Sequence, residues 1–239
     1  MPWRDRLIIA LDVNTADAAL DIVDRLGSDV TTYKVGFELF VSAGPAVVQS
    51  IHERGKRIFL DLKYHDIPNT VAKAAVAATR MGVFMFNMHA SGGLDMMQRT
   101  VSAVNELCAG EGLSRPKIIA VTMLTSMTND VLKNELTINH TVKTQVRTLA
   151  VLAQKAGLDG VVASPQETAM IKEQCGQQFL VVTPGIRPSW SPPDDQRRTA
   201  TPQEAIRDGA DFIVMGRAIM NAEDPAKALE LVSLEMLSA

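Results

Sequence analysis

Lysine and carboxylate side chains stand in or directly after three successive apolar runs in the first third of the chain: Asp12, Lys34, and the group Asp61, Lys63 and Asp66. Asp61 and Lys63 are two positions apart, so an extended strand points both side chains to the same side. A lysine flanked by carboxylates keeps its proton, which excludes the neutral amine that a Schiff base requires. A charged lysine can instead donate a proton and stabilise a developing anion. The cluster therefore predicts a reaction that passes through a carbanion.

A second group of residues combines glycine with arginine near the end of the chain. Gly185 and Arg187 follow one apolar run, and Gly216 and Arg217 follow the next. Glycine lets the backbone approach an anion, arginine pairs with its oxygens, and a helix that begins near Arg217 offers free N–H groups. We therefore predict a phosphate site here, in preference to two ordinary helix-capping turns.

Eight short apolar runs must position these side chains. The runs are continuous rather than alternating, which indicates strands buried on both faces of a parallel sheet. A glycine that could end a helix in the left-handed conformation precedes each of the last seven runs. The predicted strands are residues 7–11, 30–35, 58–60, 83–88, 118–124, 161–163, 179–182 and 212–215, and the glycines are Gly27, Gly55, Gly82, Gly112, Gly157, Gly176 and Gly209.

The segments between the runs have the spacing of amphipathic helices. In residues 15–26, for example, Ala19, Val23 and Leu26 approximate one apolar face. Eight strand and helix units of about 30 residues each suit a (β/α)8 barrel of ~250 residues better than an open sheet. We predict an α/β fold, a (β/α)8 TIM barrel, in which residues 1–239 form a single catalytic domain. Further helices are expected at residues 70–80, 94–107, 141–156 and 202–208.

A barrel of this kind gathers the carboxyl ends of all its strands at one mouth, where the loops after strands seven and eight commonly hold phosphate. Each charged side chain alone could be an ordinary structural ion pair. Buried ion pairs often give no net stabilisation, however, and five charges at one mouth exceed what stability requires. We therefore favour catalysis on one side of the mouth and phosphate binding on the other.

Residues 188–202 form a polar, proline-rich connection that is too long for a simple loop in a compact barrel. The connection starts at the predicted phosphate loop, so we expect a lid over the ligand rather than a disordered insertion. Gln196, Arg197 and Arg198 could each reach an anion from this lid.

Composition excludes several other classes of protein. The 24 Lys and Arg residues against 27 Asp and Glu leave a net charge of −3, without the basic excess that nucleic-acid binding needs. The chain is 46% hydrophobic, which is enough for one large core and excludes disorder. The first apolar run, residues 7–11, is too short for a signal peptide or a membrane span.

The cysteines and histidines show no metal-binding pattern. Cys108 and Cys175 have neither the spacing of a metal site nor that of a disulfide framework, so we expect a reduced, cytoplasmic protein. The four histidines also lack ligand spacing. His89 ends the fourth run, and we expect it to be a packed, hydrogen-bonded histidine rather than a functional one.

Residues 61–70, Asp-Leu-Lys-Tyr-His-Asp-Ile-Pro-Asn-Thr, resemble the signature of the orotidine 5′-phosphate decarboxylase family. Other family elements follow in the same order and spacing over nearly the whole chain. They are Leu-Asp12, Tyr-Lys34-Val-Gly, Leu-Thr125-Ser, Pro-Gly-Ile-Arg187, Gln196 and Met-Gly216-Arg217. The resemblance implies a barrel that converts orotidine 5′-monophosphate to UMP and CO2 in pyrimidine synthesis, without a cofactor or a metal.

The resemblance also implies a role for each matching residue. Lys63 would deliver a proton to C6 of the pyrimidine, and Asp61 would lie beside the substrate carboxylate and stabilise the Lys63 ammonium. Lys34 and Asp66 would complete a Lys-Asp-Lys-Asp array, and Asp66 and Thr70 would reach into the site of the second subunit of a homodimer. The substrate-binding residues would be Asp12 and Lys34 at the ribose, Thr125 and Ser126 at the pyrimidine, and Arg187, Gln196, Gly216 and Arg217 at the phosphate, together with Asp61 and Thr70.

Two alternatives remain. Barrels resembling 3-keto-L-gulonate 6-phosphate decarboxylase or hexulose phosphate synthase share the Asp-x-Lys-x-x-Asp pattern and use Mg²⁺. They carry a metal-binding glutamate where this chain has Lys34, whose charge would repel the ion. A barrel that only binds a phosphosugar is the other alternative, but binding alone does not need Asp61, Lys63 and Asp66 together.

Overall fold

Eight parallel strands close into a barrel in chain order, with β8 paired to β1 through Val214 and Ile8. This computed structural model describes residues 2–191 and 199–239. The strands are β1 (Leu7–Ala10), β2 (Thr32–Gly36), β3 (Arg57–Tyr64), β4 (Met85–His89), β5 (Lys117–Val121), β6 (Gly160–Val162), β7 (Leu180–Thr183) and β8 (Phe212–Met215). The predicted single-domain (β/α)8 barrel is confirmed.

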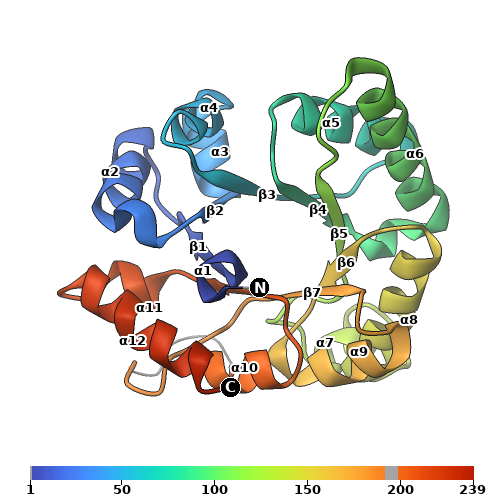
Figure 1. The fold of residues 1–239 in the computed structure, drawn as a ribbon. Coiled ribbons are helices and arrows are strands. Elements are labelled where there is room, and N and C mark those ends of the chain that lie inside the picture. Colours follow the sequence, from blue (N-terminus) through green and yellow to red (C-terminus); the bar gives the residue numbers. More distant parts are fainter. Residues whose placement is uncertain (1, 192–198) are drawn as a thin grey trace.

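Helices surround the barrel, and α1 lies across one of its ends (Figure 1). Because β1 begins directly after α1, this is the amino-terminal end of the strands. The helices are α1 (Trp3–Arg6), α2 (Ala16–Leu26), α3 (Phe37–Ala43), α4 (Ala46–His52), α5 (Pro68–Arg80), α6 (Gly93–Glu111), α7 (Asn129–Asn134), α8 (Val142–Lys155), α9 (Thr168–Cys175), α10 (Pro202–Arg207), α11 (Arg217–Met220) and α12 (Pro225–Leu237).

Every predicted strand and helix is present, with ends that differ by a few residues. The seven predicted glycines all have positive φ, and Gly27 and Gly112 directly follow α2 and α6. Several helices were not predicted, among them α3 and α4, because Gly44 and Pro45 divide that segment into two short helices with little periodicity of their own. The apolar run at residues 58–60 is only the middle of β3, which continues, as expected, through Asp61 and Lys63 and ends at Tyr64.

Side chains alternate between the barrel interior and the layer under the helices. Ile8, Ala10, Phe59, Met85, Ile119, Val182, Phe212 and Val214 pack together in one buried cluster, whereas the neighbouring strand residues Tyr33, Val35, Leu60 and Phe86 belong to the larger outer cluster. Asp61 is two positions beyond Phe59 and therefore shares its side of β3. The Asp61 side chain therefore points into the barrel, one layer nearer the carboxyl ends of the strands than Phe59.

Candidate active site

Two adjoining cavities open at the carboxyl ends of the strands and share three lining residues, Lys34, Pro184 and Val214, so they form one continuous cleft. The other residues of the first cavity are Ala10, Asp12, Gly185, Ile186, Arg187, Met215, Gly216, Arg217 and Ala218. Those of the second are Phe59, Asp61, Lys63, Val121, Met123, Leu124, Thr125, Val162 and Ala163. One half of the cleft therefore carries the predicted anion-binding residues, and the other carries charges beside apolar side chains.

Four side chains form an alternating chain of charges along the cleft. Lys63 Nζ lies 2.8 Å from Asp61 Oδ1, and the other oxygen of Asp61 lies 3.5 Å from Lys34 Nζ. Lys34 in turn lies 2.9 Å from Asp12 Oδ1. Only 12% of the Asp61 side chain is exposed, so the paired ammonium groups offset the cost of burying its charge. We call Lys63, Asp61, Lys34 and Asp12 the charge chain.

Lys63 occupies an unusual backbone conformation at the end of β3. Its φ is +45°, in the left-handed region that non-glycine residues rarely adopt. The pairing between β3 and β4 also shifts register between Leu60 and Tyr64. Asp61 and Lys63 share one side of the strand, as alternation predicts, but the strand is not regular there. Such backbone strain is typical of functional sites.

Gly36 makes room for the ammonium group of Lys34. A β-carbon at this position would lie 2.9 Å from Lys34 Nζ, closer than side-chain carbons approach nitrogen atoms. This role of Gly36 was not predicted from the sequence, where the residue is only part of the Tyr-Lys34-Val-Gly motif. Its signal was a glycine two positions after a strand lysine, on the same side of the strand.

Asn87 is the second residue of the site that was not predicted from the sequence. It is fully buried in β4, donates a hydrogen bond of 2.6 Å to Asp61 Oδ1 and accepts one of 2.8 Å from the backbone N–H of Lys63. The apolar neighbours Phe86 and Met88 hid it within a predicted strand. A lone amide inside such a run was the available signal, because buried amides need partners.

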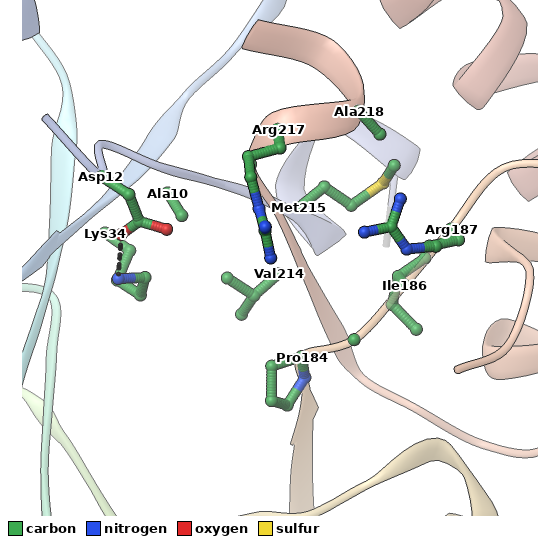
Figure 2. A pocket seen from close by; sticks show the side chains of 12 residues that line it. Ala10, Asp12, Lys34, Pro184, Ile186, Arg187, Val214, Met215, Arg217 and Ala218 are labelled. Carbon is green, nitrogen blue, oxygen red and sulfur yellow. Dashed lines mark hydrogen bonds and ion pairs between the residues drawn. The ribbon is translucent and has the colours of Figure 1, made fainter. Parts of the chain in front are cut away.

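The loops after β7 and β8 hold the predicted phosphate residues against the first cavity. Figure 2 shows Arg187 and Arg217 reaching into the space between the two loops from different sides. Arg217 is the first residue of α11. A β-carbon at Gly216 would lie 3.4 Å from that of Ala10 and 3.6 Å from Asp12 Oδ2, which is ordinary van der Waals contact, so this loop lies directly against the end of β1. The geometry fits an anion with several oxygens.

The remaining predicted residues divide into three groups. Thr125 lines the second cavity, whereas Ser126 is exposed and is not among its lining residues. Asp66, just before α5, and Thr70, in its first turn, are exposed and are not part of the charge chain; Asp66 accepts a hydrogen bond of 2.6 Å from Ile67 N–H. Gln196 lies outside the described residues.

The predicted lid at residues 188–202 is described only at its two ends, since residues 192–198 lie outside the described part of the chain. Arg187 N–H donates to the carbonyl of Ala200 over 2.9 Å, and Ile186 pairs with Ala200 in a short parallel bridge. On the other side, Ser189 N–H donates to Glu235 over 3.1 Å. The connection therefore leaves and rejoins the chain beside Arg187.

His89 lies at the end of β4, and its ring packs against that of His65 with 5.4 Å between the centroids. Burial lowers the pKa of His89, and the charges of His65 and Lys63 act in the same direction, while Asp61 opposes them. The expected packing of His89 is present, but within the described residues its side chain has no hydrogen bond, so the expectation of a hydrogen-bonded histidine is not borne out. Cys108 and Cys175 are free, and burial raises the pKa of Cys175.

The described residues contain neither a cluster of metal ligands nor a membrane-spanning helix. Residues 2–191 and 199–239 contain no group of three or more His, Cys, Asp or Glu that could hold a metal ion. In the same part of the chain, no helix has the length and apolar character needed to cross a membrane.

Comparisons with known proteins agree over almost the whole chain. The model of the Orotidine 5′-phosphate decarboxylase / HUMPS family matches residues 5–232. A curated orotidine 5′-phosphate decarboxylase of Moorella thermoacetica is 50% identical, covering 99% of this chain and 94% of that protein. One from Geobacter metallireducens is 49% identical over 98% of this chain and 97% of that protein.

Solved structures show the same similarity. The crystal structure of orotidine 5′-phosphate decarboxylase from Lactobacillus acidophilus superposes with a TM-score of 0.85 at 41% identity, covering 96% of this chain and 98% of that one. That of an uncharacterized conserved protein from Geobacillus kaustophilus gives 0.84 at 38% identity, covering 96% and 99%. The likeness therefore extends from sequence to fold.

Proposed function

The chain belongs to the orotidine 5′-phosphate decarboxylase family, and we propose that the family's reaction takes place in the cleft formed by the two adjoining cavities. The protein is a carboxy-lyase that converts orotidine 5′-monophosphate to UMP and CO2 in pyrimidine biosynthesis. The observation that carries the assignment to this cleft is its continuity: the cavity of Lys63 and Asp61 adjoins that of Arg187 and Arg217 through Lys34. A ribose monophosphate with a pyrimidine at one end would bind along such a cleft.

The phosphate would bind at the Arg187 and Arg217 end of the cleft, with Gly216 allowing close approach. Arginine pairs with phosphate oxygens through charge-assisted hydrogen bonds. The ribose would then lie beside Lys34 and Asp12, which line the first cavity. We assign Gln196 to the phosphate as well, on the family resemblance.

The pyrimidine would occupy the second cavity, where Thr125 and the apolar residues Val121, Met123 and Val162 surround the charges of Lys63 and Asp61. An apolar wall accepts neutral CO2 without a desolvation cost. We assign Ser126 to the pyrimidine only on the family resemblance, since its exposed side chain is not part of this lining.

The chemical step breaks the bond between C6 and the carboxyl carbon. CO2 leaves and the electron pair remains on C6, where the Lys63 ammonium delivers a proton and later regains one from solvent. Fixed charges that are in place before the reaction stabilise the carbanion without reorganisation. Asp61 holds the Lys63 ammonium at 2.8 Å and opposes the negative substrate carboxylate, a repulsion that disappears when neutral CO2 forms.

A second subunit would complete each site by contributing Asp66 and Thr70. Both are exposed in the single chain, and exposed apolar side chains lie in neighbouring elements: Phe37 is 53% exposed, Val41 80% and Ile67 68%. The Phe37 ring centroid is 5.7 Å from Lys63 Nζ, which ties this apolar surface to the reacting group. Large apolar side chains exposed near the site support the proposal that two copies associate there.

Two further proposals concern location and partners. We propose that the enzyme works in the cytoplasm, where its two free cysteines stay reduced. The net charge of −3 supports the proposal that it has no nucleic-acid partner.

The direct test of the function is conversion of orotidine 5′-monophosphate in the presence of EDTA. We expect the substrate absorbance to fall and UMP and CO2 to appear in equal amounts at an undiminished rate. Loss of activity in EDTA and recovery with Mg²⁺ would favour the sugar-phosphate relatives instead.

Subunit exchange tests the shared site. Lys63→Ala and Asp66→Asn homodimers, each nearly inactive, would be dissociated together in mild denaturant and reassociated. Half of the dimers would be mixed, and each mixed dimer would contain one wild-type site, so activity should return to roughly a quarter of the wild-type value. A mixture that stays inactive despite confirmed exchange would refute the shared site.

A further inference from the structure

Asn87 is a polar side chain in the apolar interior of the barrel. It shares the inner side of β4 with Met85, which packs in the inner cluster, whereas Phe86 and Met88 face the outer layer. Its exposed fraction is 0%. A buried amide without partners is strongly unfavourable, so the partners of Asn87 indicate what it does.

Both polar atoms of Asn87 contact β3. Nδ2 donates to Asp61 Oδ1 over 2.6 Å, and Oδ1 accepts from the backbone N–H of Lys63 over 2.8 Å. A carboxylate can only accept and a backbone N–H can only donate, so these partners define the orientation of the amide. One buried side chain thus links the carboxylate of Asp61 to the backbone of Lys63.

The hydrogen bond from Lys63 N–H to Asn87 Oδ1 lies where β3 becomes irregular. Lys63 has a φ of +45°, and the register between β3 and β4 shifts between Leu60 and Tyr64. The N–H of Lys63 donates to the Asn87 amide. Such strained conformations persist only where the surroundings hold them.

The hydrogen bond from Asn87 Nδ2 to Asp61 Oδ1 determines the orientation of the Asp61 carboxylate. Oδ1 receives both Asn87 Nδ2 and Lys63 Nζ, the latter at 2.8 Å, while Oδ2 faces Lys34 Nζ at 3.5 Å. Rotation of the carboxylate would break the bond from Asn87. Asn87 therefore holds the orientation in which one oxygen serves each lysine.

We propose that Asn87 is a positioning residue for decarboxylation, which rests on the proposed function. It acts through its neighbours and does not line either cavity of the cleft. It fixes the direction of the Asp61 carboxylate and the backbone of Lys63, so that the ammonium group is held where C6 accepts its proton. Misplacing a reacting group by about 1 Å can cost about 100-fold in rate.

The first test is Asn87→Leu, which removes both hydrogen bonds and keeps the branched shape of the side chain. We expect kcat to fall about 100-fold while the Kd for UMP stays within about threefold, because the phosphate end is not touched. The matched control is Thr32→Val, which removes the 3.1 Å bond from Arg57 to a buried hydroxyl at the other end of the barrel. It should keep kcat within about twofold.

The second test is Asn87→Asp, which keeps an acceptor for Lys63 N–H but faces a carboxylate towards Asp61. Two carboxylates this close share a proton at low pH, and that proton restores the bond from position 87 to Asp61. We expect kcat of Asn87→Asp to recover partly at low pH and to fall as pH rises, a limb that wild type lacks. If Asn87→Leu does not fold, this pH profile decides alone.

Two outcomes would overturn the proposal: kcat of Asn87→Leu within about threefold of wild type, or an Asn87→Asp variant with the wild-type pH profile. If the wild-type protein itself forms no UMP, the proposed function has failed, and the role of Asn87 is judged by crystallography. The distance from Lys63 Nζ to Asp61 Oδ1 should then exceed 2.8 Å in Asn87→Leu. An unchanged distance would contradict the positioning role.

Discussion

The Nζ atom of Lys63 lies 2.8 Å from Oδ1 of Asp61, although a single residue separates them in β3. In a regular strand, side chains two positions apart point the same way but start about 6.6 Å from each other. Here the second residue has a φ of +45°. The central ion pair of the site thus comes from one short, irregular stretch of chain, and its geometry depends on that local backbone.

Removal of Arg217 should affect phosphorylated ligands selectively. We expect Arg217→Ala to weaken UMP binding by about 10- to 100-fold, because charge-assisted hydrogen bonds to the phosphate are lost. Uridine binding should change by less than about threefold. Calorimetric titration with both ligands measures the difference. An equal loss for UMP and uridine would show that the phosphate binds elsewhere.

Gly36→Ala should impair activity with little loss of stability. The new methyl group would lie 2.9 Å from Lys34 Nζ, the end of a flexible side chain, so the ammonium must move. The φ of Gly36 is −95°, which alanine adopts without strain. We expect kcat/KM to fall about 10- to 100-fold and the Tm to stay within about 3 °C of the wild-type value.

The control for this variant is Gly110→Ala, where a methyl group meets no atom within 4 Å. It should leave kcat/KM unchanged. Wild-type activity in Gly36→Ala would mean that the position of Lys34 does not matter to catalysis.

Replacement of His89 should reduce the acid sensitivity of the fold. Burial, with His65 and Lys63, lowers the pKa of His89 in the native state, whereas an unfolded histidine titrates near pH ~6.5. As pH falls through about 6.5, the unfolded state therefore binds the proton first and the free energy of unfolding decreases. Above that pH neither state binds it, and the native state keeps its full stability.

The Tm of His89→Gln should therefore fall less than the wild-type Tm when the pH is lowered from about 7.5 to about 5.5. The exposed His140 provides the comparison, and His140→Gln should lose as much Tm as wild type. Thermal unfolding at both pH values measures the effect. An equal loss in His89→Gln and wild type would contradict it.

The pattern of apolar runs was enough to predict the barrel, because burial on both faces and a glycine before each of the last seven runs are local properties. The charged residues of β3 were recognisable by their type and spacing. The hydrogen bonds of Asn87 were not recognisable, because they join β4 to β3. Asn87 is 26 positions from Asp61 and 24 from Lys63 in the chain. The positive φ of Lys63 has no signal either, because non-glycine residues adopt it only through tertiary contacts.

Turnover of orotidine 5′-monophosphate by Lys63→Ala, measured beside the affinity of this variant for UMP, tests whether Lys63 is the proton donor. If Lys63 delivers the proton to C6, turnover should be lost while the Kd for UMP stays within about tenfold of wild type, as for a group used mainly in the transition state. A Lys63→Ala enzyme that retains more than about a tenth of wild-type turnover would contradict the account.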